Sequence, residues 1–472
     1  MINCNNSIHP WLVVAVLVSA CGGTVDEAPA TSVDSGDSND AGIAESGVDA
    51  TAPEAGYVIP EAGPGEAAPP AEAGPSEAGH ADVEAGYVDV EAGFADVEAG
   101  ADLCPLTLIQ SGVLPDPPEA GNLFAGPIAV ATDQGFLIQI GQESPHVLQG
   151  YRVAVADDGT VGASTVTSAT SCPGSTVLNG IATAWNPTSG TGFLALSAKE
   201  CQASGSGPRM HVENFGASGQ SMASVAYELP GPLVLDSNQS AAEGSVASNF
   251  LLAASMPVGG SFLYDFDGIA VSFDVTPIPP GTTDANQAHV ATSSALRATV
   301  GGSPNALALA LSPTGGGPTS LHTIVGWGEG ATALAAWNQR AAVVRATTDG
   351  VHVFAAQTGS NAATELHVDT EPRYSVDVAA VGDQLVVAAG GTSSDIKVWR
   401  VTGAGSVDLD LAPTLDVSLS PTEVTGLAGY DGQRVAVAAA RGRVLVTWVV
   451  TPQPNTVPYP SIAGYAILAC GE

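Results

Sequence analysis

The chain has 472 residues, with 48 Asp and Glu against 12 Lys and Arg, and a formal net charge of −36 at pH 7. No Lys or Arg precedes Arg152, and 19 of the acidic residues lie between Gly22 and Leu103. Because both parts of the chain are acidic and repel polyanions, the composition argues against nucleic acid as a partner. No apolar run after residue 20 approaches the length of about 20 residues that a membrane-spanning helix needs.

The first feature along the chain is an apolar run, Trp11 to Ala20, that leads into Val18-Ser19-Ala20-Cys21. About ten apolar residues are too few to span a bilayer, but they suit the core of a signal peptide. The tetrapeptide resembles the lipobox of bacterial lipoproteins, in which an aliphatic residue and two small ones precede an obligatory Cys. The resemblance implies cleavage before Cys21, a diacylglyceryl group on its thiol and acylation of the new amino terminus. The alternative is an ordinary secretory signal with a chance Cys, and the lack of Lys and Arg in Met1 to Pro10 departs from the family pattern.

Two or more acyl chains hold a protein stably at a membrane, so the resemblance implies a lipid-anchored protein of the cell envelope. Gly22 follows the Cys where a retention-type lipoprotein often carries Asp, which favours the outer membrane or the cell surface.

The segment 21–103 that follows is rich in Ala, Glu, Gly, Asp, Pro and Val, and Glu-Ala-Gly recurs at 54, 61, 72, 77, 84, 91 and 98. Glycine in every copy and the lack of an aliphatic seam exclude a coiled coil. With little to bury and no counter-charge, the segment is expected to be a disordered tether. Binding of divalent cations or of a basic partner by the acidic repeat is the alternative.

Four cysteines remain once Cys4 is removed with the signal peptide and Cys21 is lipidated. An even number in an exported protein favours disulfides, and four cysteines allow three pairings. We expect Cys172 to pair with Cys201 as a local staple, and Cys104 to pair with Cys470 across the ends of the folded domain. Metal ligation is the alternative, but no C-x-x-C pair supports it.

From Cys104 to Glu472 the chain alternates short aliphatic runs with Gly, Asp, Asn, Ser and Pro, which predicts an all-β fold. Seven copies of a strand–turn–strand pattern are predicted, with second strands beginning near 136, 193, 250, 306, 352, 385 and 435. Their average spacing of about 50 residues is typical of a β-propeller. Small residues are expected in the strands that crowd the central axis. The pattern is similar to WD40 and kelch propellers in period only, because no Gly-His…Trp-Asp signature occurs.

We therefore predict a signal peptide over 1–20, a tether over 21–103 and a single seven-bladed propeller over 104–472. In that propeller the strand at 463–470 would pair with the segment that begins at Cys104, closing the ring and removing free sheet edges. Six or eight blades, or two β-sandwiches, are the alternatives.

The chain contains none of three common catalytic motifs: a Gly-x-Ser-x-Gly elbow, His-Glu-x-x-His and a phosphate loop. We expect Gly326-Trp-Gly-Glu-Gly330 to be a turn between blades, Asp265-Phe-Asp267-Gly268 to be a turn and not a calcium site, and His352 to be an interior histidine. Five tryptophans could form a sugar-stacking face but are expected in the core: Trp185, Trp327, Trp337, Trp399 and Trp448.

No catalytic residue, metal or cofactor is therefore predicted. The favoured function is a non-catalytic module that binds a protein or a glycan, held at the membrane by its lipid. An extracellular enzyme, either a glycan hydrolase or lyase or a cofactor-dependent dehydrogenase, is the alternative, and a structural envelope protein without a ligand is a third. An enzyme would gather carboxylates, His and Arg from different blades at one mouth of the channel.

Overall fold

The computed structural model describes residues 105–116, 122–144, 147–167, 170–171, 178–198, 209–228, 240–243, 250–256, 260–267, 272–278, 287–303, 305–360, 363–391, 395–406, 409–425, 430–452 and 461–470. The predicted signal peptide and tether lie outside these residues, and so do Cys21, Cys104, Cys172 and Cys201. For Cys470 the backbone alone is described.

The described residues form seven antiparallel sheets, which we number as blades in chain order. Blade 1 contains β2 (Asn122–Thr132), β3 (Gly135–Ser144), β4 (Val147–Val155), β5 (Thr165–Val166) and β6 (Thr170–Ser171). Blade 2 contains β7 (Leu178–Asn186), β8 (Thr191–Ala198), β9 (Arg209–Gly216) and β10 (Ser221–Glu228). Blade 3 contains β11 (Ser240–Glu243), β12 (Phe250–Met256), β13 (Gly260–Asp267) and β14 (Ser272–Pro277).

Blade 4 contains β15 (Gln287–Thr292), β16 (Leu296–Ser303), β17 (Ala306–Pro313) and β18 (Ser320–Val325). Blade 5 contains β19 (Ala331–Trp337), β20 (Arg340–Thr347), β21 (Gly350–Gln357) and β22 (Ala363–Asp369). Blade 6 contains β23 (Ser375–Val381), β24 (Gln384–Gly390), β25 (Ile396–Thr402) and β26 (Ala412–Leu419). Blade 7 contains β27 (Tyr430–Ala440), β28 (Arg443–Pro452), β29 (Ile462–Cys470) and β1 (Leu106–Val113), and the short helix α2 (Pro421–Thr425) precedes it.

The first strands of the blades form a closed inner circle, because each contacts the first strand of the blade before it and of the blade after it. The predicted seven-bladed β-propeller is therefore the fold of this domain. As expected, small residues recur in these inner strands, for example Ala182 and Ala184 in β7 and Ala333 and Ala335 in β19. Small side chains let neighbouring sheets approach one another close to the axis.

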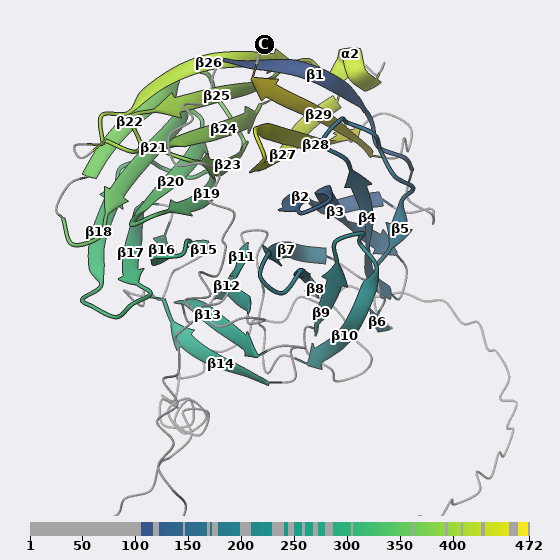
Figure 1. The fold of residues 1–472 in the computed structure, drawn as a ribbon, viewed down its shortest axis with the longest axis horizontal. Coiled ribbons are helices and arrows are strands. Elements are labelled where there is room, and N and C mark those ends of the chain that lie inside the picture. Colours follow the sequence, from purple (N-terminus) through teal and green to yellow (C-terminus); the bar gives the residue numbers. More distant parts are fainter. Residues whose placement is uncertain are drawn as a thin grey trace, which may run out of the picture. The chain divides into compact units, whose positions relative to one another are not determined.

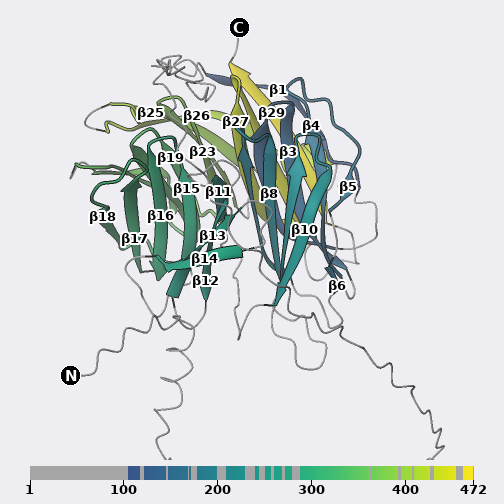
Figure 2. The ribbon, with the colours of Figure 1, turned by 60° about the horizontal axis from the view of Figure 1, so that its bottom comes forward.

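The two ends of the blades make two different faces. The near face carries the turns between first and second strands; β1 begins there, because Leu106 pairs with Cys470 and Arg443 pairs with Ala469. The far face carries the turns between second and third strands and the connections from one blade to the next. Figure 2 shows strands of neighbouring blades running side by side between the two faces.

Blade 7 closes the ring by joining the two ends of the domain, since β1 is its outermost strand and pairs with β29. This confirms the predicted pairing of 463–470 with the segment after Cys104. A second contact closes the ring on the near face, where the Arg441 guanidinium donates to both carboxylate oxygens of Asp157 at 2.8 Å and to Gly135 O at 3.2 Å. The first and last blades are thus held by a strand and by an ion pair.

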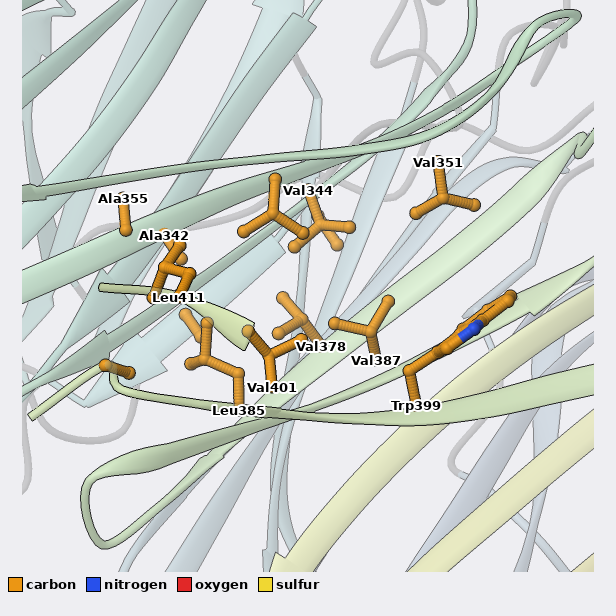
Figure 3. Close-up of a cluster of buried hydrophobic side chains, with 14 of the residues drawn as sticks. Ala342, Val344, Val351, Ala355, Val378, Leu385, Val387, Trp399, Val401 and Leu411 are labelled. Atoms are coloured by element: carbon orange, nitrogen blue, oxygen red, sulfur yellow. The ribbon is translucent and has the colours of Figure 1, made fainter. Parts of the chain in front are cut away.

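The core lies between the blades, as apolar side chains of one sheet pack on those of the next. Figure 3 shows one such interface, where Val344 and Val351 of blade 5 pack against Val378, Val387 and Trp399 of blade 6. Burial of aliphatic side chains contributes roughly 1.5–3 kcal/mol each, so these interfaces stabilise the ring.

The predicted number of repeats is confirmed, but three copies were assigned to the wrong strands. The strands near 306 and 352 are third strands, β17 and β21, and the strand near 435 is the first strand β27. First, second and third strands share the same small-aliphatic composition and short Gly-containing turns, so composition does not distinguish them.

Candidate functional site

The face of blade 5 that packs on blade 4 is built of cross-strand rows. Antiparallel pairing places side chains of adjacent strands opposite one another on the same face. The row at the near face is all alanine: Ala336, Ala341, Ala356 and Ala363. The middle row is apolar except at its rim: Leu334, Val343, Phe354 and Glu365.

The row at the far face is polar in every strand, and we call it the polar row: Thr332, Arg345, His352 and His367. It runs from the inner strand β19 to the outermost strand β22. Arg345 lies near the end of β20, two residues before the far-face turn that begins after Thr347. The row therefore crosses the blade from the axis to the rim at the level of the far face.

The outer end of the polar row is a stack of three rings. Trp327 follows β18 in the connection from blade 4, and its ring lies 5.4 Å from that of His352, at an interplanar angle of 26°. His352 in turn stacks on His367 at 4.3 Å and 11°. Trp327 is 5 % exposed, whereas His367 is exposed, so the stack leads from the interface to solvent.

Two carboxylates flank this stack. Trp327 Nε1 donates to Glu365 Oε1 at 2.6 Å, and His352 Nε2 lies 3.4 Å from Asp349 Oδ1. His367 Nε2 lies 3.1 Å from the backbone oxygen of Asp349. Hydrogen bonds from Thr347 and His352 lower the pKa of the Asp349 carboxyl, which is therefore ionised near neutral pH. The outer end thus offers imidazole rings and carboxylate acceptors to solvent.

The inner end of the polar row meets His289 of β15. Its neighbours Ala288 and Val290 pack against blade 3, so by strand alternation His289 faces blade 5. Burial and the nearby Arg345 charge lower the pKa of His289 to about 4, so this imidazole is neutral at physiological pH. No hydrogen-bond partner reaches His289 Nε2 or Thr332 Oγ1 within the described residues.

Next to the polar row on the far face is an ion-pair cluster. The Arg373 backbone N–H donates to Thr347 O at 2.9 Å. Its side chain is bonded to Asp369 at 2.9 Å and to Glu371 at 2.8 Å, and Lys397 lies 2.7 Å from Glu371. These charges neutralise one another, and so the cluster anchors the connection between blades 5 and 6.

A second ionic cluster lies buried between blades 1 and 2. Arg152 and Glu213 are 1 % and 0 % exposed and 3.0 Å apart. Arg152 also donates to Gln139 Oε1 and to Gly219 O, and its guanidinium lies 4.1 Å above the Phe215 ring. Because solvent does not reach these groups, the cluster is structural.

The residues predicted from the sequence fall in several places. Four of the tryptophans are buried, as expected: Trp327, Trp337, Trp399 and Trp448. Gly326–Gly330 is the connection between blades 4 and 5, as predicted. The turn predicted at Asp265 and Asp267 is wrong, because both residues lie within β13 and pair with β14. His352 is in a strand, as predicted, but its side chain is 12 % exposed and belongs to the polar row.

The described part of the chain contains no group of three His, Cys, Asp or Glu side chains placed to hold a metal ion. None of its helices is long and apolar enough to cross a bilayer. Sequence reasoning missed the polar row because its four members come from four strands at irregular intervals, and only the strand register brings them together.

With the fold defined as a seven-bladed propeller, comparison with known proteins finds likenesses among solved structures. No family model and no curated protein matches the chain. Trypanosoma rangeli sialidase in complex with the inhibitor DANA is 8 % identical with a TM-score of 0.41, covering 75 % of this chain and 57 % of the sialidase chain. Kuenenia stuttgartiensis hydrazine synthase is 11 % identical with a TM-score of 0.46, covering 73 % of this chain and 100 % of that one. The chain therefore matches less than two thirds of the sialidase, and neither likeness indicates what it binds.

Proposed function

We propose that this chain is a lipid-anchored protein of the cell envelope, at the outer membrane or cell surface, whose propeller binds a protein or a glycan without catalysing a reaction. The lipobox-like Val18-Ser19-Ala20-Cys21 supports the anchor. The observation that carries the binding function is the polar row, which crosses blade 5 at the far face while the chain enters β1 at the near face. The polar row and the start of β1 therefore lie at opposite faces of the propeller.

The distribution of ionisable side chains supports binding over catalysis. Among the described residues, His and Arg side chains lie at several separate interfaces, which include the buried Arg152–Glu213 cluster, the polar row and the Arg373 cluster. An enzyme of the alternative class needs acids, bases and cations from several blades at one mouth of the channel.

The anchor is tested by expressing the full chain in a Gram-negative host with an alkyne-tagged fatty acid. We expect the label on the wild type, its loss in Cys21→Ala, and accumulation of the unprocessed chain with globomycin. An unlabelled wild type that is still exported would mean an ordinary secretory protein.

Binding is tested with the full chain on an array of defined glycans and peptides, with His367→Ala as the variant and Tyr374→Ala as a matched exposed control. His367 is in the stack, whereas the exposed Tyr374 lies in the connection to blade 6. We expect weaker binding for the first variant only. Conversion of a bound glycan, followed by mass spectrometry, would instead identify the enzyme alternative.

A further inference from the structure

The inner end of the polar row contains hydrogen-bonding groups that the protein itself does not use. His289 and Thr332 are 5 % and 7 % exposed, and their Nε2 and Oγ1 atoms have no partner among the described residues. A buried polar atom left unpaired costs roughly 1–3 kcal/mol, so two at one place indicate that something else fills the position.

Three side chains converge there from two blades. Thr332 and Arg345 are directly paired across β19 and β20, and both face blade 4, from which His289 projects. The inner strands β15 and β19 contact one another, so His289 faces this pair, and the Arg345 charge contributes to the lowered pKa of His289. A neutral imidazole N–H, a hydroxyl and a guanidinium are all able to donate hydrogen bonds.

We propose that His289, Thr332 and Arg345 form a binding site for a carboxylate group. The carboxylate belongs to a ligand that binds at the far face, and it enters between blades 4 and 5. This inference deepens the proposed binding function and depends on it. One positive charge with two neutral donors matches a monoanion, and Arg is the side chain best suited to recognise the planar carboxylate group.

The charged groups around the site agree with this choice. Burial lowers the pKa of Arg345, and the exposed Glu329, in the connection that precedes β19, partly opposes this effect. It is the chain's own carboxylate near the guanidinium, and an incoming carboxylate competes with it. His352, the partner of Arg345 across β20 and β21, is held by its stack with Trp327 toward the outer end of the polar row.

The full chain, purified in detergent, is titrated with sodium acetate at constant ionic strength, with chloride as reference, while its melting temperature is followed. Acetate is expected to raise the melting temperature saturably. Glucuronate represents an acidic sugar and N-acetylglycinate represents the carboxyl end of a peptide. The compound that resembles the natural ligand is expected to bind at least tenfold more tightly than acetate. An acetate response no larger than that of chloride in the wild type overturns the proposal.

Two variants separate a ligand site from a structural water. Thr332→Val keeps the shape and removes the unpaired hydroxyl, so without acetate it is expected to be as stable as the wild type or more stable, and to bind acetate at least fivefold more weakly. If Thr332→Val is instead destabilised and the wild type ignores acetate, a structural water occupies the position. Glu329→Gln removes the competing carboxylate and is expected to bind acetate about threefold more tightly.

Thr447→Val is the matched control, since the buried Thr447 hydroxyl donates to Gly464 O at 2.9 Å in blade 7. It is expected to lose stability with an unchanged acetate response. If acetate has no effect but the array still identifies a ligand, the carboxylate site is wrong and the proposed binding function stands. Failure of the carboxylate site is thereby distinguished from failure of the proposed function.

Discussion

The carboxylate of Asp377 in β23 accepts a hydrogen bond at 2.7 Å from the backbone N–H of Val437 in β27, the inner strand of the next blade. Ser375 accepts another from the N–H of Val435 at 2.8 Å. The inner strands of blades 6 and 7 are thus bridged by side chains in place of a backbone ladder. These acceptors satisfy N–H groups that would otherwise be unpaired at a sheet edge.

This bridge makes stability depend on pH. Burial raises the pKa of Asp377 to about 6, against the effect of its two backbone N–H bonds. The folded state then holds the Asp377 proton more tightly than the unfolded chain does. The protonated carboxyl therefore adds to the free energy of unfolding below about pH 4, and this contribution is lost as pH rises through about 6. Asp377→Asn should gain stability relative to wild type by on the order of 2 kcal/mol between pH 4 and 7. Urea unfolding at each pH measures the difference, and a constant difference contradicts the raised pKa.

Removal of one member of the buried Arg152–Glu213 pair is expected to destabilise the fold strongly. Arg152→Met removes the guanidinium from the buried Glu213 carboxylate and leaves the His211 imidazole 3.8 Å from it, which should cost about 3–5 kcal/mol in denaturant unfolding. Adding Glu213→Gln removes the stranded charge and should recover at least half of that loss. A cost below about 1 kcal/mol for the single variant would mean that solvent enters this interface.

Tyr465 ties the closing strand to its neighbours. Its hydroxyl donates to Gly159 O at 3.1 Å and accepts from Gln110 Nε2 of β1 at 3.2 Å. Tyr465→Phe should lower the free energy of unfolding by about 1–2 kcal/mol, because a buried carbonyl loses its donor. Hydrogen exchange should quicken first in β1. Tyr374→Phe, at a site 52 % exposed, should change neither quantity.

The predicted disulfide between Cys104 and Cys470 stays a proposal that the closure of blade 7 makes testable. Leu106 is the partner of Cys470 in the ladder, and Cys104 precedes it by two residues. Mass spectrometry of the unreduced, digested chain should find the two peptides joined. The Cys104→Ser/Cys470→Ser double variant should be less stable by about 2–4 kcal/mol. Equal stability of this variant and the oxidised wild type would show that the strand pairing suffices.

The fold was predictable because its signals are local. Strand-length aliphatic runs, Gly-containing turns and a period near 50 indicated the propeller, and the apolar 463–470 segment indicated its closure. The place of each strand within its blade was not predictable. The runs at 306–311 and 181–185 both alternate alanine with larger side chains, but they lie in a third and a first strand. The polar row was not predictable either, because Thr332 and His367 are placed on one face only by the registers of three successive strand pairs.

Pairing of β1 with β29 also fixes when the ring can form. Thr107 bonds to Ala469, 362 residues further along the chain, so the first strand to leave the ribosome must wait for the last. A chain interrupted during synthesis or translocation therefore has an unfinished seventh blade with exposed edges, which makes it a target for quality-control proteases.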